Sequence, residues 1–182
     1  MRLEHGADPL FAQTARALGL AMAERGIDLV YGGGRLGLMG IAAAAVLGAG
    51  GRAYGVIPRA LIDLEVAHAG LTELHTVETM HERKAKMTEL TDAFLALPGG
   101  IGTLDELFEA WTWNALGYHS KPFALLNVGG FWDELVALAD KVTEAGFMSQ
   151  ARRLQLLVAH DVGEALDKLD AAAEAAETRM VW

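Results

Sequence analysis

Short apolar runs alternate along this chain with longer stretches of helical periodicity, and this alternation limits the fold more than any other feature. Strands separated by helices favour a parallel sheet with crossover helices. The sequence therefore predicts an α/β fold, a Rossmann-like doubly wound parallel sheet with helices on both faces, in a single domain. The predicted strands cover residues 27–31, 53–57, 71–77, 93–97, 123–127 and 156–159. The predicted helices cover residues 9–25, 38–47, 80–90, 103–116, 131–145 and 162–177.

Composition narrows the protein class. The 182 residues suit one nucleotide-binding domain over residues 1–182, with an Ala/Glu-rich tail at 171–182 that frays from the last helix. Charges interrupt every apolar stretch, although 52% of the residues are hydrophobic, so we expect no membrane partner. Zero Cys and the lack of an apolar leader in residues 1–10 predict a cytoplasmic protein. The net charge of -9 argues against a nucleic acid polymer as partner.

A glycine-rich segment, PGGIGTLDE at residues 98–106, lies between a predicted strand and a predicted helix. Its glycines let the backbone approach a ligand closely, and the start of the helix offers N–H groups and the positive end of a dipole. We therefore expect an anion there, and phosphate is the anion that fits best.

Glu106 follows this segment and has two interpretations. In the first, the carboxylate is held beside the phosphate pocket and takes part in chemistry. In the second, Thr103 is the N-cap of the helix and Glu106 completes a capping box by accepting the N–H of Thr103. The spacing of Thr103 and Glu106 is compatible with both.

A second glycine-rich turn, YGGGRLGLMG at residues 31–40, also joins a strand to a helix. Ligands bind at the carboxyl ends of strands in such sheets, so the turn is a second candidate for ligand binding. The dinucleotide fingerprint requires an acid after the second strand, where this chain has VIPR at 56–59, so we predict no hydride-transfer cofactor. The alternative is a tight turn that needs glycine for a positive φ.

The segment MHERK at residues 80–84 opens a predicted helix. In one interpretation its cationic side chains face the pocket, although the pattern alone favours a second one. The alternative is a solvated charged face in which Glu82 pairs with Lys86 at helical spacing. The six histidines include no pair at metal-ligand spacing on one helix, so no metal is expected. Trp111 and Trp113 lie on an apolar helix surface that we interpret as core or subunit interface.

These motifs together resemble the lonely guy family, the cytokinin riboside 5'-monophosphate phosphoribohydrolases, long mislabelled as possible lysine decarboxylases. The resemblance rests on YGGGxxGLMG at 31–40, GVIP at 55–58, LTEL at 71–74, MHERK at 80–84 and PGGxGTLxE at 98–106. It implies hydrolysis of the N-glycosidic bond of an N6-modified adenosine monophosphate, which yields free base and ribose 5-phosphate. It also implies a homodimer that binds a small-molecule nucleoside monophosphate.

By position, the resemblance implies that Arg83 and Glu106 form the catalytic pair. Cleavage of a ribosyl bond builds positive charge on the sugar, which a carboxylate stabilises while it orients or deprotonates the attacking water. An arginine keeps its proton in proteins, so Arg83 is assigned to anchoring substrate or fixing Glu106 rather than to acid catalysis. The substrate-binding positions, from the glycine turns and the resemblance together, are Gly32, Gly33, Gly34, Glu65, Lys84, Gly99, Gly100, Ile101, Gly102, Thr103, Leu104, Asp105 and Thr112.

Two points set this chain apart or stay open. Family members begin with a strand and a Cys-Gly-Ser-Ser turn, whereas this chain opens with MRLEHGADP, so we expect the usual first strand to be absent or residues before Leu10 to be irregular. A non-catalytic nucleotide or cofactor carrier on the same fold, with Glu106 as a cap only, is the alternative function. A pyridoxal phosphate decarboxylase is rejected, because no sequence context singles out a Schiff-base Lys.

Overall fold

A computed structural model describes residues 6–62, 68 and 70–179 of the protein. Within it the chain divides into two compact units, one ending at Thr91 and the other beginning at Asp92. Each unit is described by itself below.

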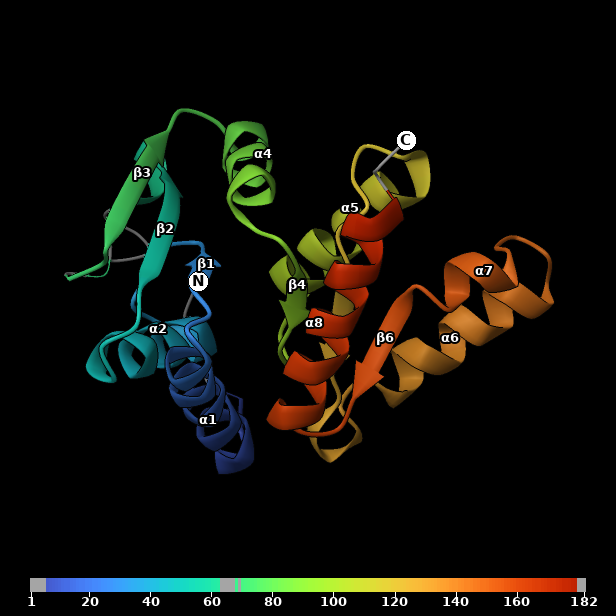
Figure 1. Ribbon diagram of the computed structural model, residues 1–182, viewed down its shortest axis with the longest axis horizontal. Helices are drawn as coiled ribbons and strands as arrows, with labels where there is room; N and C mark the ends of the chain where they lie inside the picture. The colour runs from blue at the N-terminus through green and yellow to red at the C-terminus, as the bar shows by residue number, and fades with distance from the viewer. Residues whose placement is uncertain (1–5, 63–67, 69, 180–182) are drawn as a thin grey trace. The chain divides into compact units, whose positions relative to one another are not determined.

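The first unit contains one three-stranded parallel sheet (Figure 1). Its elements are α1 (Pro9–Arg25), β1 (Leu29–Tyr31), α2 (Gly37–Gly48), β2 (Ala53–Pro58), the 3-10 turn η1 (Arg59–Leu61), β3 (Glu73–Val77) and α4 (Met80–Leu90). The strand order is β1-β2-β3, with Tyr31 opposite Gly55 and Gly55 opposite Leu74. α1 packs closely on α2, because a Cβ at Gly19 would come within 2.7 Å of the Ala45 Cβ.

The second unit contains another three-stranded parallel sheet. Its elements are β4 (Phe94–Ala96), α5 (Ile101–Leu116), β5 (Phe123–Leu126), the 3-10 turn η2 (Val128–Gly130), α6 (Asp133–Glu144), α7 (Gln150–Arg153), β6 (Leu156–Ala159) and α8 (Val162–Arg179). β5 lies between β4 and β6, and all four of its residues are buried. Trp111 of α5 packs on Phe123 of β5, with ring centroids 5.8 Å apart, in a core that also contains Trp132.

Local signals explain where the elements begin and end. Asp8 accepts a hydrogen bond from the N–H of Leu10 and caps α1, Pro9 fills the first helical position, and Gly26 ends the helix with a φ of 71°. α1 and α4 coincide at both ends with the helices predicted from the sequence. Each predicted strand is present within two residues at either end.

The α/β architecture with parallel strands and crossover helices is therefore confirmed, with one difference of detail. The strands pair within two three-stranded sheets, whereas the sequence was interpreted as one sheet. The strand that the resemblance would place in the middle falls on residues 1–6, of which the structure describes only Gly6, and Gly6 is not in a strand. That prediction, the fraying of the tail beyond Arg179 and the single-domain prediction remain untested.

Short helical elements at η1, η2 and α7 were not predicted. Each is only three or four residues long, too short for hydrophobic periodicity to reveal. Among the residues that the structure describes, no helix has the length and apolar character needed to cross a membrane.

Candidate functional site

The turn after β1 requires glycine for different structural reasons at Gly33 and at Gly32. Gly33 has a φ of 79°, a backbone conformation that only glycine adopts freely, and its carbonyl accepts the N–H of His68 at 2.9 Å. A Cβ at Gly55 of β2 would come within 2.7 Å of the Gly33 Cα, so these two glycines pack back to back. The tight-turn interpretation is therefore correct for Gly33. It does not cover Gly32 and Gly34, whose φ values are not positive.

Gly32 is needed because the guanidinium of Arg83 lies on it. The Arg83 Nη2 donates to the Gly32 carbonyl at 3.3 Å, and a Cβ at Gly32 would overlap that same nitrogen. Arg83 is buried, with only 7% of its surface exposed, although it is a charged residue on a helix. A long-range contact thus joins α4, which MHERK opens, to the glycine turn after β1.

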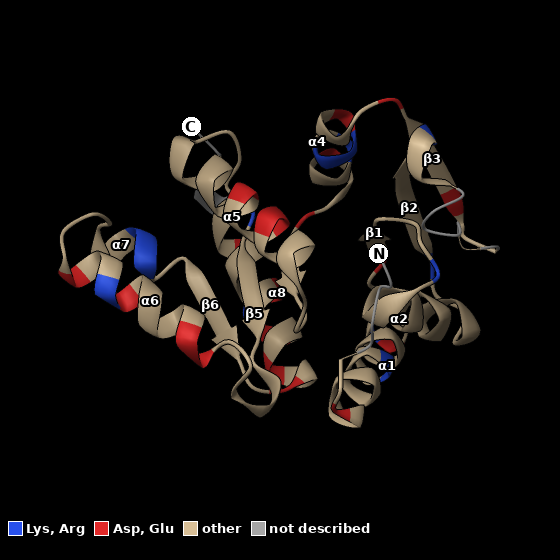
Figure 2. Cartoon of the chain, turned by 180° about the vertical axis from the view of Figure 1, so that it is seen from behind, with Lys and Arg blue, Asp and Glu red and all other residues tan. Residues whose placement is uncertain are grey.

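The alternative of a solvated charged face is wrong for Arg83 and for the proposed pair. Lys86 forms its ion pair with Glu89, at 3.0 Å, instead of with Glu82. Glu82 accepts the N–H of Thr79 at 3.3 Å while Thr79 accepts the N–H of Glu82 at 3.1 Å, which is a capping box at the start of α4. Figure 2 shows basic and acidic residues together on α4, and Lys84 there is half-buried.

The glycine-rich segment at residues 98–106 leads into α5, and this helix begins two residues earlier than predicted. Gly100 is the N-cap, and it has no side chain that could accept from the first N–H groups of the helix. A Cβ at Gly99 would overlap the Thr103 hydroxyl, so packing explains Gly99. Thr103 is therefore the third residue of the helix, and the prediction that it caps the helix is wrong.

Gly102 has no explanation within the fold, whereas Gly100 is the N-cap of α5, a position at which glycine is one of the preferred residues. Neither has a positive φ, and a Cβ built on either would meet nothing within 4 Å apart from the chain neighbours and, for Gly102, the backbone of its own helix. Glycine inside a helix is less stable than alanine by roughly 1 kcal/mol, so Gly102 has a cost that no packing contact repays. Ile101 between them is 77% exposed. An open, glycine-lined helix start of this kind is suited to close approach by an anion.

Glu106 lies in the second turn of α5, six residues after the N-cap. It cannot complete a capping box, because that role belongs to the third residue of a helix. The structure therefore excludes the capping interpretation. Glu106, Asp105 and Thr112 are exposed, and Leu104 packs against the core of the second unit.

A groove of about 290 Å³ runs along α5 in the second unit, between α5, α6 and the segment that leads to α7. Phe108, Thr112, Leu138 and Phe147 line it, and Phe147 is 87% exposed. Trp111 is 8% exposed and belongs to the core, as one of the two interpretations held. Trp113 packs edge-on against Tyr118 instead, with ring centroids 6.4 Å apart.

The predicted site residues are divided between the two units. The first unit holds Gly32, Gly33, Gly34, Arg83 and Lys84, and the second holds the segment 99–106 and Thr112. Glu65 lies outside the described residues. Among the described residues, no group of three or more His, Cys, Asp or Glu side chains is placed to hold a metal ion.

One pair of site residues was missed by sequence reasoning. The pattern Thr79-x-x-Glu82 is the same capping signal as Thr103-x-x-Glu106, and it directly precedes Arg83. The pattern was visible, but it was assigned only at the later position.

Comparison with known proteins gives a consistent result. The sequence model of the family described as possible lysine decarboxylase matches residues 39–169. The chain is 47% identical over 161 residues to the probable cytokinin riboside 5'-monophosphate phosphoribohydrolase LOGL1 of Oryza sativa subsp. japonica, covering 88% of this chain and 72% of that protein. It is 46% identical over 157 residues to the cytokinin riboside 5'-monophosphate phosphoribohydrolase of Rhodococcoides fascians, covering 86% and 79%.

Solved structures resemble the fold at lower sequence identity. The molybdenum cofactor binding protein of Rippkaea orientalis has a TM-score of 0.69 and 20% identity, with 92% of this chain and 90% of that chain covered. The molybdenum cofactor carrier protein of Chlamydomonas reinhardtii has a TM-score of 0.65 and 21% identity, with 90% and 88% covered. At these identities the likeness concerns the fold alone.

Proposed function

The chain belongs to the LOG family of cytokinin riboside 5'-monophosphate phosphoribohydrolases, and on that premise we propose that it hydrolyses the N-glycosidic bond of adenosine 5'-monophosphates, including N6-modified ones. The products are the free base, a cytokinin where the N6 group is present, and ribose 5-phosphate. The observation that carries the proposal is the start of α5, where a Cβ at Gly100 or at Gly102 would meet no packing neighbour and where nothing in the fold explains Gly102.

The substrate phosphate is proposed to bind at this helix start. N–H groups of the first turn are the donors that a helix leaves without intrahelical partners, and the dipole there favours negative charge. We assign phosphate and ribose contacts to the segment from Gly99 to Asp105, and further substrate contacts to Thr112, Lys84 and the Gly32–Gly34 turn. Glu65 is assigned to the substrate on the resemblance alone.

Glu106 is the proposed catalytic carboxylate. As the bond from the ribose carbon to the base nitrogen breaks, positive charge develops on the sugar, and a nearby carboxylate lowers the energy of that state. The same carboxylate orients a water molecule and takes its proton as the new carbon–oxygen bond forms. The base nitrogen leaves with the electron pair of the broken bond and takes up one proton from solvent, so that the neutral free base is released. Its position beyond the first turn of α5 leaves Glu106 without a capping role.

Arg83 is the second proposed catalytic residue, and its role is to anchor the substrate. The side chain keeps its charge, and its contact with the Gly32 carbonyl holds the guanidinium beside the glycine turn after β1. An arginine fixed in this way recognises phosphate or ribose oxygens with little loss of side-chain freedom on binding.

The carrier alternative is not favoured. The carrier proteins that resemble this chain do so at 20–22% identity, which concerns the fold alone, whereas the named phosphoribohydrolases are 42–48% identical. The carrier interpretation also needed Glu106 to complete a capping box with Thr103 as the N-cap, and the N-cap of α5 is Gly100.

The test is incubation of the protein with AMP and with N6-isopentenyl AMP, followed by chromatography. Release of free base together with ribose 5-phosphate is the expected result. Recovery of intact nucleotide bound to the protein, with no base released, would contradict the hydrolase and favour the carrier.

We also propose that the protein is a cytoplasmic homodimer whose partner covers the groove along α5. Leu138 in the groove is 53% exposed and Phe147 is 87% exposed, an apolar surface that is costly to leave in water. Leu138→Asp is expected to give monomers in light scattering at micromolar concentration. Leu20→Asp, which changes a 45% exposed leucine on α1, is the matched control and should stay dimeric. A wild-type monomer would contradict the dimer.

A further inference from the structure

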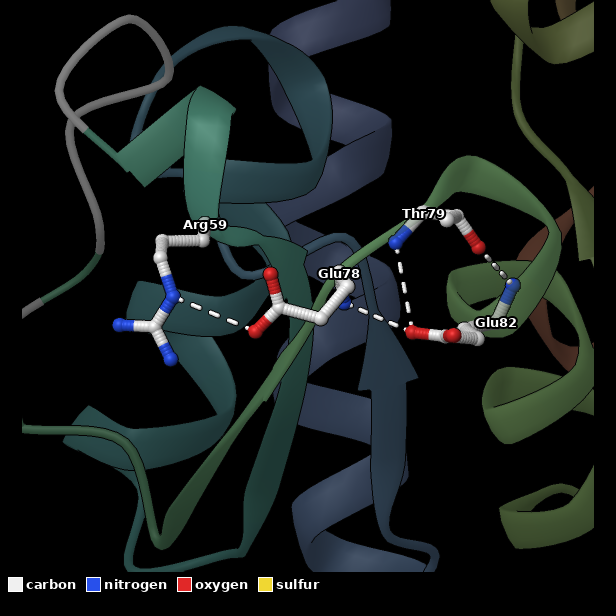
Figure 3. Close-up of polar contacts among 4 residues, drawn as sticks. All are labelled: Arg59, Glu78, Thr79 and Glu82. Carbon is white, nitrogen blue, oxygen red and sulfur yellow. Dashed lines mark hydrogen bonds and ion pairs between the residues drawn. The ribbon is translucent and has the colours of Figure 1, made fainter.

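The segment that joins β3 to α4 is held by one carboxylate. The Glu82 Oε2 accepts the N–H of Glu78 at 2.7 Å and the N–H of Thr79 at 3.3 Å, as Figure 3 shows. A capping box requires only the second of these bonds. Glu82 therefore fixes two consecutive backbone N–H groups, and through them the direction in which the chain enters α4.

The neighbouring ion pair contributes less to this arrangement. The Arg59 Nε lies 3.3 Å from the Glu78 Oε1, but the two side chains are 70% and 68% exposed. Exposed pairs of this kind are screened by water and salt and stabilise little. The hydrogen bonds of Glu82 and Thr79, which involve the backbone itself, are what define the first turn of the helix.

Arg83 is the residue that depends on this first turn. Its own N–H donates to the Thr79 carbonyl at 3.1 Å, and its guanidinium reaches the Gly32 carbonyl at 3.3 Å. The second distance is already at the long end of a hydrogen bond, so a small shift of the helix start would break it. α4 as a whole packs on all three strands of its sheet.

We propose that Glu82 is a positioning residue for Arg83: by holding the N–H groups of Glu78 and Thr79 it fixes the first turn of α4, and with it the guanidinium on the Gly32 carbonyl. This inference rests on the proposed function for its catalytic readout. Glu82 itself touches neither substrate nor reacting atoms; it acts through the backbone of the turn that carries Arg83.

The chemistry of the contact separates this role from a simple effect of charge. The amide of Glu82→Gln keeps an oxygen at the same reach and can accept both N–H groups, but it carries no charge. Glu82→Asp keeps the charge and loses one methylene of reach. Hydrogen-bond positioning therefore orders the variants as Gln above Asp above Ala, whereas an electrostatic role would place Asp above Gln.

The experiment measures kcat/KM for AMP hydrolysis and, separately, AMP affinity by calorimetry, at a temperature well below the melting point of every variant. Glu82→Ala is expected to lose about tenfold or more, since a shift on the order of 1 Å can reduce turnover by about 100-fold. Glu82→Gln should stay within about threefold of wild type, and Glu89→Ala, which removes an exposed carboxylate later in α4, within about twofold.

Two outcomes would overturn the inference: Glu82→Asp more active than Glu82→Gln, or Glu82→Ala as active as Glu89→Ala. Glu82→Gln and Glu82→Asp are conservative enough to fold if the alanine variant does not. The affinity measurement keeps this inference distinct from the proposed function. If wild type binds AMP without hydrolysing it, the hydrolase fails, while a loss of AMP affinity in the order Gln, Asp, Ala still supports the positioning of Arg83.

Discussion

Glu106→Gln gives the sharpest test of the mechanism, because it keeps the size and hydrogen-bonding reach of the side chain and removes its charge. The structure limits what the substitution does to stability. Glu106 is exposed and lies in the second turn of α5, beyond the first turn in which the dipole acts strongly and beyond the capping position. The expected change in the free energy of unfolding is about 0.5 kcal/mol or less.

The expected effect on catalysis is much larger. Loss of a general base or of electrostatic stabilisation reduces turnover by a factor on the order of 100 or more. A hundredfold loss corresponds to about 2.7 kcal/mol of activation free energy, several times the expected change in stability. The two quantities are therefore separable in one variant.

The assay follows release of free base from AMP by chromatography, with thermal melting and AMP affinity measured on the same preparations. Glu134→Gln is the matched control, since it removes an exposed carboxylate from the first turn of α6 in the same unit. The control should retain the activity of wild type. If Glu106→Gln also stays within a few-fold of wild type, with an unchanged melting temperature, Glu106 is not the catalytic carboxylate.

Three further substitutions test the surroundings of the site. Gly32→Ala places a Cβ where the Arg83 guanidinium lies, so we expect kcat/KM for AMP to fall by about tenfold or more with the fold retained; wild-type kinetics would show that Arg83 does not need this contact. Tyr31→Phe removes a buried hydroxyl that has no hydrogen-bond partner in the structure and whose pKa is raised by burial, so urea denaturation should show stability unchanged or higher by about 1 kcal/mol, and a clear loss would reveal a partner. Gly102→Ala adds a Cβ that would meet no packing neighbour within 4 Å and improves helix propensity by up to about 1 kcal/mol, so the melting temperature should rise while phosphate affinity falls; unchanged affinity would remove this glycine from the anion site.

Local sequence signals were enough to predict most of the secondary structure. Asp8 and Pro9 define the start of α1, Gly26 ends it, and the apolar runs identify each strand to within two residues. These features depend on neighbours in the chain, so periodicity and capping rules capture them. The motifs around Arg83 and Glu106 were equally visible, because they are short and contiguous.

The sequence could not decide between two copies of one capping pattern. Thr79-x-x-Glu82 and Thr103-x-x-Glu106 have the same spacing, and which of them caps a helix depends on where the helix begins. α4 begins directly after Thr79. α5 begins before Thr103, and the Thr103 hydroxyl packs on Gly99 instead of capping the helix.

The alternation of strands and helices and the identity of the candidate residues are encoded in short segments, so both can be predicted without the structure. Only the tertiary structure decided that Arg83 is buried on the Gly32 carbonyl, a contact between residues 51 positions apart. Only the tertiary structure showed that packing accounts for Gly99 and leaves Gly102 open. The burial of Arg83 is set by a segment distant in the chain, and the packing of Gly99 on Thr103 is set by where α5 begins, so the sequence pattern reveals neither.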